Sequence, residues 1–301
     1  MSQNRQSTRA RPARGPSRAQ LARQRTRRRQ QIAAAATVAV VIAVGVLFGI
    51  KLSGGKTAAV NSTATSPKVT GPAPASVLST LASVSPATLA QAAKSVKVTA
   101  PKAITAPALT AGGKPKVLYI GTEYCPFCAA ERWPVVLALS QFGTFSGLGA
   151  TTSSAVDVFP NTQTFSFHGA TYTSSYLTFS GVETTSNQVV GGSYGRLDTP
   201  TPDEQTVFQT YDRGPYVSGS AGSIPFVDLG GRYIQSGAAY SPGVLAGKGL
   251  TEIADSLPQP SSPAGQDIDA AAGVITADLC QLTGNQPAAV CALFPAGSTG
   301  S

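Results

Sequence analysis

Histidine, tryptophan and cysteine are scarce in this chain of 301 residues, which has one histidine, one tryptophan and four cysteines. Because no acidic residues converge on His168 in the sequence, it does not form a catalytic triad, and we expect it at the surface or in a hairpin. A four-cysteine zinc site needs two closely spaced pairs, whereas Cys280 and Cys291 enclose ten residues. We therefore expect no bound metal and no other cofactor.

Acidic residues are absent from the first 122 positions, and the first one is Glu123. Residues 1–116 contain 18 basic residues, and ten of them are arginines within residues 1–31. Residues 117–301 contain 5 basic and 14 acidic residues, which gives this part a net charge of −9. The overall net charge of +9 thus describes a basic arm joined to an acidic globular part, and we expect no nucleic-acid partner.

One long apolar run follows the arginine-rich arm. Residues 32–50, IAAAATVAVVIAVGVLFGI, carry no charge and would span about 28 Å as a helix, close to the apolar thickness of a bilayer. We predict a single transmembrane helix there, with the arm 1–31 in the cytoplasm and residues 51–301 outside. A cleaved signal peptide is the alternative, although this run is longer than such peptides usually have. Residues 51–74 are rich in small and polar residues, which predicts a flexible linker.

The remaining chain, residues 75–301, has the pattern of a mixed α/β domain with a helical C-terminal end. Apolar spacing and capping residues predict helices, and short apolar or alternating runs predict strands. The two strands at 162–169 and 171–184 are expected to form a hairpin or a small sheet. The predicted helices cover 76–84, 85–93, 129–143, 201–211, 241–257 and 265–284, and the other predicted strands cover 116–121 and 223–237, the last as two strands joined at Gly230–Gly231.

The stretch GTEYCPFCAAERW at 121–133 places Cys125 and Cys128 between a predicted strand and a predicted helix. Such a pair is a redox-active dithiol, half of a metal site or a structural disulfide. A helix N-terminus favours the first, because its free N–H groups and partial positive charge lower the pKa of a cysteine. We predict that Cys125 is the exposed nucleophile and that Cys128 resolves mixed disulfides by forming the Cys125–Cys128 disulfide. Trp133 is expected to pack behind the pair in the core.

Several segments of the chain resemble a known family. EYCPFCAAERW, ALSQFGTF, TFSFHGATYTS, SIPFVDLGGRY and ITADLCQLTGNQPAAVC are together similar to a membrane-anchored, thioredoxin-like family catalogued as domain of unknown function 929. The resemblance covers residues 75–301 and implies a thioredoxin-like fold, in which a cis-proline loop packs against a dithiol between a strand and a helix. It also implies a β-rich insertion at about 145–220 and a helical C-terminal extension at about 262–301.

The resemblance further implies roles for residues near the dithiol. Ser223-Ile224-Pro225 resembles the cis-proline loop, so Pro225 would position a substrate peptide against the backbone of Ile224. Tyr124 and Phe127 are expected to contact the same substrate.

Two departures from the superfamily pattern affect the expected chemistry. Thioredoxin-type enzymes often bury an acid six residues before the first cysteine, where it moves the proton of the resolving thiol, but this chain has Tyr119 there. Glu123, on a turn that we expect to be exposed, is the predicted substitute. Strongly oxidising periplasmic enzymes have a histidine between their cysteines, and Phe127 in this place predicts a less oxidising pair.

The other two cysteines and Arg132 each have an expected partner. An even number of cysteines outside the cytoplasm predicts a disulfide between Cys280 and Cys291, either as a structural staple or as a second redox pair. Arg132 is expected at the surface, in an ion pair with Glu123 or Glu131, and contact with a substrate is the alternative.

Together these features predict a membrane-anchored oxidoreductase that exchanges thiols and disulfides outside the cytoplasm. Its expected partners are the thiols or disulfides of exported proteins and a redox partner in the membrane. The alternative is a membrane-tethered binding or envelope protein that keeps the scaffold, with Cys125–Cys128 as an inert disulfide.

Overall fold

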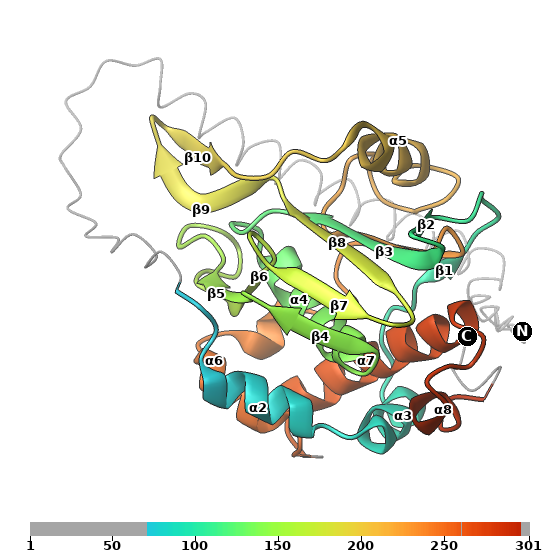
Figure 1. The fold of residues 1–301 in the computed structure, drawn as a ribbon. Coiled ribbons are helices and arrows are strands. Elements are labelled where there is room, and N and C mark those ends of the chain that lie inside the picture. The colour runs from blue at the N-terminus through green and yellow to red at the C-terminus, as the bar shows by residue number, and fades with distance from the viewer. Residues whose placement is uncertain (1–70, 260, 296–301) are drawn as a thin grey trace, which may run out of the picture. The chain divides into compact units, whose positions relative to one another are not determined.

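The computed structural model of the chain describes residues 71–259 and 261–295, all of which lie in one unit, Ala64–Ser301. The predicted arm, the predicted transmembrane helix at 32–50 and all but the last four residues of the predicted linker lie outside the described residues. Among the helices that the structure describes, none is long and apolar enough to cross a bilayer. The described part is a mixed α/β fold with one main sheet and seven α-helices (Figure 1).

The main sheet has six strands and is built around β3 (Lys114–Gly121). Strand β3 pairs in parallel with β8 (Thr178–Glu183) and antiparallel with β11 (Phe226–Leu229), so the neighbouring strands run in the order β8-β3-β11. Strand β12 (Tyr233–Ser236) follows β11 as the next antiparallel neighbour, as the predicted turn at Gly230–Gly231 requires. The remaining strands of this sheet are β1 (Lys102–Ala103) next to β12, and β2 (Thr110–Ala111) next to the start of β3.

Strand β3 separates two apolar cores, because alternate side chains of a strand point to opposite faces. Val117 and Tyr119 belong to the larger core, whereas Leu118 and Ile120 belong to a smaller core with residues of α5 (Pro202–Tyr211). All four side chains are buried. The predicted buried strand at 116–121 is confirmed, and its continuous apolar run follows from the cover on both of its faces.

Helices α4 (Pro126–Ser140) and α7 (Pro263–Leu282) lie on the opposite side of the sheet from α5 (Figure 1). Helix α3 (Pro86–Ser95) approaches α7 closely, since a side chain at Gly273 would overlap the Leu89 carbonyl oxygen. The other helices are α2 (Ala75–Ser83), α6 (Leu250–Ser256), α8 (Ala288–Cys291) and the 3-10 helix η1 (Pro242–Leu245).

Local capping signals predicted the starts of two helices. Ser85 accepts a hydrogen bond from the Thr88 backbone N–H at the start of α3, and Thr201 and Glu204 form the predicted capping box of α5. The continuous helix predicted at 241–257 is wrong. It is divided into η1 and α6, because Gly247 between them has a φ of 73°, which a right-handed helix excludes.

The strands predicted at 162–169 and 171–184 form, but they do not pair with each other as predicted. Residues 178–183, which we assigned to an insertion, form β8 of the main sheet. Side-chain alternation predicts a strand but not its partner, which depends on residues far away along the chain. The small pairs are β4 (Gly143–Ser146) with β7 (Thr171–Ser174), β5 (Gly149–Thr152) with β6 (Gln163–Ser166), and β9 (Thr185–Val190) with β10 (Ser193–Arg196).

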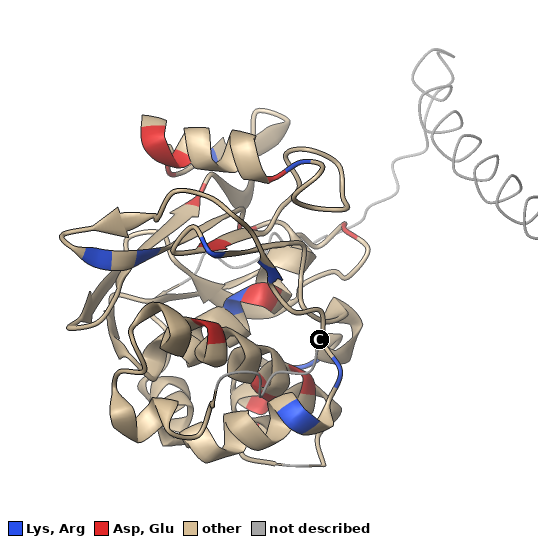
Figure 2. Ribbon diagram, turned by 90° about the vertical axis from the view of Figure 1, so that its right-hand side faces the viewer, with Lys and Arg blue, Asp and Glu red and all other residues tan. Residues whose placement is uncertain are grey.

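Charged residues are sparse and dispersed in the described part (Figure 2). Its ion pairs include Lys116–Glu204, which joins β3 to α5 at 2.7 Å and keeps one partly exposed partner. The pair Arg132–Glu183 differs, because both side chains are completely buried. A fully buried ion pair is costly unless its hydrogen bonds are complete. This pair lies near the two cysteines, and its hydrogen bonds are described with them below.

The predicted disulfide between Cys280 and Cys291 is present and ties the end of α7 to α8. Leu282, two residues after Cys280, lies against Gly230 at the end of β11. The disulfide therefore lies near the C-terminal end of β11.

Removing this disulfide is expected to destabilise the fold moderately. Cys280→Ala combined with Cys291→Ala should lower the free energy of unfolding by about 3 kcal/mol, because the bond restricts the unfolded chain. Urea unfolding followed by Trp133 fluorescence measures the change, and Cys280→Ser combined with Cys291→Ser serves as the matched control for side-chain polarity. An unchanged unfolding midpoint in both double variants would contradict a structural role.

Candidate functional site

The two closely spaced cysteines lie where β3 leads into α4. Strand β3 ends at Gly121, and Cys125 is the N-cap residue of α4, with Pro126 at the first helical position. The glycine at 121 is needed because any side chain there would overlap the Tyr119 ring. The predicted arrangement of strand, turn and helix is thus confirmed, with the helix beginning three residues earlier than expected.

The two thiols are arranged differently from the prediction in two respects. Cys125 is only 8% exposed and is not the exposed nucleophile that we expected, because the turn before α4 is covered by neighbouring segments. Cys128 is completely buried. The structure holds both residues as free thiols, so the predicted Cys125–Cys128 disulfide is not formed in it. The Cys128 backbone N–H donates to Cys125 Sγ at 3.4 Å.

The environment separates the acidities of these two thiols. A hydrogen bond from the Cys128 thiol lowers the pKa of Cys125 to about 7 despite partial burial, and the backbone N–H groups of Cys128 and Phe127 and the charge of Arg132 act in the same direction. Burial raises the pKa of Cys128 well above its ordinary value, and the hydrogen bond to Cys125 adds to this effect. At neutral pH the pair therefore holds a partly ionised thiol beside a protonated one.

A buried ion pair lies one helical turn below the cysteines. Arg132 Nε and one terminal nitrogen donate to the two oxygens of Glu183 on β8, each at 2.7 Å, and the same terminal nitrogen donates to the Thr122 carbonyl oxygen at 2.6 Å. Burial opposes the charge of Arg132, but the Glu183 carboxylate outweighs this effect and holds the pKa of Arg132 above its ordinary value. Arg132 therefore ties the turn that carries Cys125 to the neighbouring strand of the sheet and places a positive charge near both thiols.

The predicted surface location of Arg132 is wrong, because its side chain is buried in this pair. Glu131 does not pair with it but accepts a hydrogen bond from the Ala239 backbone N–H at 2.8 Å, and burial raises the pKa of Glu131 to about 8. The prediction failed because charged residues are usually exposed, whereas α4 is covered almost all round. One signal was present in the sequence: Glu131 and Arg132 are the two charged residues of α4, whose other residues are mostly apolar, and Glu183 ends an otherwise uncharged strand.

Glu123, the predicted proton acceptor, is also buried rather than on an exposed turn. Its carboxylate accepts a hydrogen bond from Ser166 Oγ at 2.6 Å, and its backbone N–H donates to the Thr185 carbonyl oxygen. Strands β6 and β9, which supply these partners, cover the turn. Glu123 therefore lies close to Cys125 in sequence, and its described hydrogen bonds go to β6 and β9 rather than to a thiol.

Tyr119 lies beneath Cys128, at the position where thioredoxin-type enzymes often have an acid. Its hydroxyl donates to the Cys128 carbonyl oxygen at 3.4 Å, and its ring lies 5.9 Å from the Arg132 guanidinium carbon. Burial holds the pKa of Tyr119 well above its ordinary value, so the hydroxyl stays protonated and acts as a donor.

The loop before β11 lies at the end of the sheet where β3 leads into the cysteine turn. The peptide bond between Ile224 and Pro225 is cis, as we predicted. Strand β11 runs antiparallel to β3 with Phe226 opposite Ile120, so Pro225 comes next to the residues that lead into the cysteine turn. Pro225 is buried and Ile224 is half-buried. The Cys280–Cys291 disulfide, near the opposite end of β11, is not brought together with this site.

Aromatic side chains surround the cysteine turn. Tyr124 stacks on Tyr194, with ring centroids 4.3 Å apart, and Phe127 meets the edge of Phe159 at 5.9 Å. Phe127 is 41% exposed, which makes it the most accessible of these residues next to the cysteines. The Ser154 backbone N–H donates to the Tyr124 carbonyl oxygen, so the segment after β5 lies directly beside the turn.

The remaining predicted residues behave as ordinary structural residues. Trp133 is buried and its Nε1 donates to the Gln163 carbonyl oxygen at 3.0 Å, which confirms its place in the core. His168 is exposed, and its Nδ1 lies 2.7 Å from Asp198 Oδ1.

Within residues 71–259 and 261–295, no group of three or more His, Cys, Asp or Glu side chains is arranged to hold a metal ion.

The fold and the site define a mixed α/β protein with a pair of free cysteines at the start of a buried helix. The chain belongs to the family described as Domain of unknown function (DUF929), whose model matches residues 102–281. This match confirms the resemblance to that family and covers the whole of the main sheet, the cysteine pair and nearly all of α7. Comparisons with curated proteins and with solved structures found no match.

Proposed function

We propose that this protein is a thiol–disulfide oxidoreductase in which Cys125 is the nucleophile and Cys128 the resolving cysteine. The observation that carries the proposal is the contrast between the two thiols. Cys125 caps the N-terminus of α4 with a pKa lowered to about 7, chiefly by the hydrogen bond from the Cys128 thiol. Cys128, held protonated by burial, lies within the same turn. Thiol–disulfide exchange requires this combination of a reactive thiolate and a neighbouring reserve thiol.

The topology supports a thioredoxin-like fold for this site. The elements follow in the order β3, α4, β8, β11, β12 and α7, and the four strands lie side by side as β8-β3-β11-β12, with β3 and β8 parallel. A cis-proline at the start of β11 lies at the same edge as the cysteine pair. In this interpretation the segment that carries β4 to β7 is an insertion between α4 and β8, and Ile224, Tyr124 and Phe127 border the substrate.

In the proposed exchange, the two cysteines and the substrate disulfide account for every bond and electron. The Cys125 thiolate attacks one sulfur of the substrate, which forms a mixed disulfide and releases the second substrate sulfur as a thiolate that takes up a proton. Cys128 then loses its proton and attacks Cys125 Sγ, which forms the Cys125–Cys128 disulfide and releases the first substrate sulfur as a thiol. Two electrons pass to the substrate, and the reverse sequence oxidises a substrate dithiol.

The proposed setting is the outer side of a membrane, with residues 32–50 as the anchor and the N-terminus in the cytoplasm. Arginines on one side of an uncharged run of 19 residues support this orientation. The substrates would then be the thiols or disulfides of exported proteins, and a redox partner in the membrane would restore the starting state. The alternative, a non-enzymatic tethered binding or envelope protein, is favoured by one observation, which is the low exposure of Cys125.

Alkylation of the native protein distinguishes the two functions. The rate of Cys125 modification by iodoacetamide should follow its thiolate, with half of the maximal rate at pH about 7 and a tenfold loss for each pH unit below it. Mass spectrometry of peptides assigns the label to Cys125 or Cys128. In Cys128→Ala the midpoint should rise, because the hydrogen bond that chiefly lowers the Cys125 pKa is lost. A midpoint near pH 8.5, or a Cys125 that does not react in the folded protein, would refute the enzyme.

A further inference from the structure

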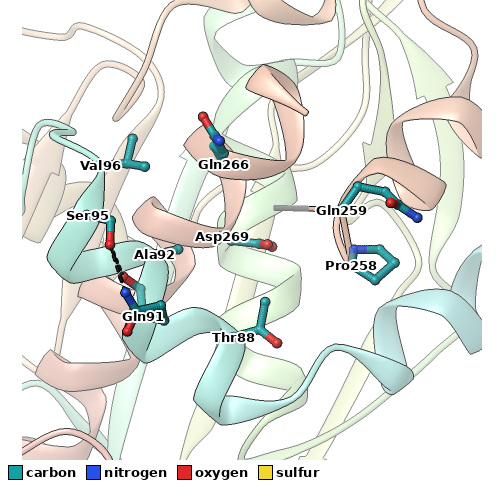
Figure 3. Close-up of a pocket in the computed structure, with 9 residues that line it drawn as sticks. All are labelled: Thr88, Gln91, Ala92, Ser95, Val96, Pro258, Gln259, Gln266 and Asp269. Carbon is teal, nitrogen blue, oxygen red and sulfur yellow. Dashed lines mark hydrogen bonds between the residues drawn. The ribbon is translucent and has the colours of Figure 1, made fainter. Parts of the chain in front are cut away.

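A pocket of about 420 Å³ lies on the helical side of the described part, apart from the cysteine site. Figure 3 shows its lining residues, which come from α3, from the segment after α6 and from the first half of α7. The volume lies in the range that holds small organic ligands. The lining of the pocket includes Thr88, Gln91 and Ala92 from α3, Pro258 and Gln259 after α6, and Asp269 from α7.

Asp269 is the one acidic residue among those that line this pocket. It is 4% exposed, and its Oδ1 atom has no hydrogen-bond partner in the described part of the chain. Figure 3 shows the carboxyl group in the middle of the lining residues, between α3 and Pro258. Burial raises the pKa of Asp269 to about 8, with no hydrogen bond or charge acting against it. The described part of the fold therefore leaves this carboxyl group without compensation for its burial.

A buried carboxyl group without a partner is unfavourable, because it has lost its water without gaining a hydrogen bond. Native proteins leave few such groups, and each one calls for a specific cause. Here Asp269 lines a space large enough for a partner that is not part of the chain (Figure 3). A ligand with hydrogen-bond donors in this space would give its carboxyl group the missing compensation.

The other lining residues favour one class of donor. No lysine or arginine is among the described residues that line the pocket, so none of these residues balances the charge of an ionised Asp269. The Thr88 hydroxyl and the amide groups of Gln91 and Gln259 can accept further hydrogen bonds from a donor held by Asp269. Ala92 and Pro258 offer apolar contact to an aliphatic chain. A primary ammonium group on an alkyl chain matches this combination of one charge, several donors and an apolar body.

We propose that this pocket binds a small molecule that carries a primary alkylammonium group, with the ammonium paired to the Asp269 carboxylate. The site is independent of the thiol chemistry proposed above, because none of its lining residues contributes to the cysteine site. Binding would ionise Asp269 and give its carboxylate a charged partner.

The test uses the full-length protein and two probes of nearly equal size, n-butylammonium and n-butanol. Saturation-transfer NMR titrations should show saturable binding of n-butylammonium and binding at least tenfold weaker for n-butanol. Asp269→Asn should weaken n-butylammonium binding at least tenfold, because the amide keeps the shape but loses the charge. Asp267→Asn, on the same helix but outside the pocket, is the matched control and should leave the affinity unchanged.

Three outcomes would overturn the proposal: no saturable binding of n-butylammonium, equal binding of both probes, or undiminished binding in Asp269→Asn. The comparison of the two probes on the unaltered protein stands even if a variant fails to fold. Alkylation of Cys125 is unaffected by these outcomes, so failure of the pocket and failure of the proposed redox function are distinguishable.

Discussion

Replacing Arg132 with methionine is expected to destabilise the folded chain by about 3–5 kcal/mol, because it leaves the Glu183 carboxylate buried without its charged partner. Both side chains are completely buried, and Glu183 accepts two short hydrogen bonds from Arg132. The Thr122 carbonyl oxygen before the cysteine turn also loses its described donor. Urea unfolding followed by Trp133 fluorescence measures the loss.

The double variant Arg132→Met with Glu183→Leu is the control for this prediction. Replacing both members of a buried ion pair with apolar residues is often neutral or stabilising, so the double variant should recover most of the stability. A single variant as stable as the original chain would mean that the pair adds nothing. A double variant no better than Arg132→Met would mean that packing, rather than the unpaired charge, causes the loss.

The same double variant tests the effect of Arg132 on the thiols, since it is expected to fold. The charge of Arg132 is one of the effects that lower the pKa of Cys125. Without it, the midpoint of the pH-dependent alkylation of Cys125 should move above pH 7 while the stability stays close to that of the original chain. A role limited to packing would leave this midpoint unchanged, so the two readouts separate positioning of the charge from support of the fold.

Cys128→Ser is expected to trap substrates as mixed disulfides with Cys125, whereas Cys125→Ser should lower the rate of thiol–disulfide exchange by about three orders of magnitude or more. The difference arises because Cys125 forms the bond to the substrate and Cys128 only resolves it. Expression of Cys128→Ser in the native membrane, followed by non-reducing electrophoresis and mass spectrometry, identifies the adducts. Reduction of a mixed disulfide between a cysteine peptide and glutathione measures the exchange rate.

Two controls accompany this trapping experiment. Cys125→Ser with Cys128→Ser should form no adducts, which excludes capture through any other residue. Cys280→Ala with Cys291→Ala should keep its exchange activity at temperatures where it remains folded, because that disulfide lies near the other end of β11. Absence of adducts in Cys128→Ser would favour the tethered binding protein, and loss of exchange in the folded variant without the Cys280–Cys291 disulfide would favour a redox relay.

Much of the described fold could be predicted from local sequence. The run KVLYIG became β3, Ser85 and Thr201 became N-caps, and the glycines at 230 and 231 became the turn between β11 and β12. In each case the residues that determine the structure lie within one or two turns of each other. The cysteine pair at the start of α4 was predictable for the same reason, since a strand, a short turn and a helix are all local features.

The environment of the cysteine pair was not predictable in the same way. Arg132 and Glu123 were expected at the surface, and both are buried by strands that follow them by 40 to 60 residues, through Glu183 and Ser166 respectively. The predicted hairpin failed because β6 and β7 each found a partner outside it. Burial and pairing depend on which distant segments cover a residue, and no local pattern encodes this.

The sequence by itself determined most of the helices and strands, the family and the place of the cysteine pair between a strand and a helix, because helix caps, turn glycines and a Cys-x-x-Cys spacing act over a few residues. Only the tertiary structure decided which charges are buried beneath the cysteines, how their thiol pKa values separate and that Asp269, which lines a pocket, has an Oδ1 atom without a hydrogen-bond partner in the described part of the chain. These properties arise from loss of water and from contacts between remote segments, so they exist only once the chain is folded.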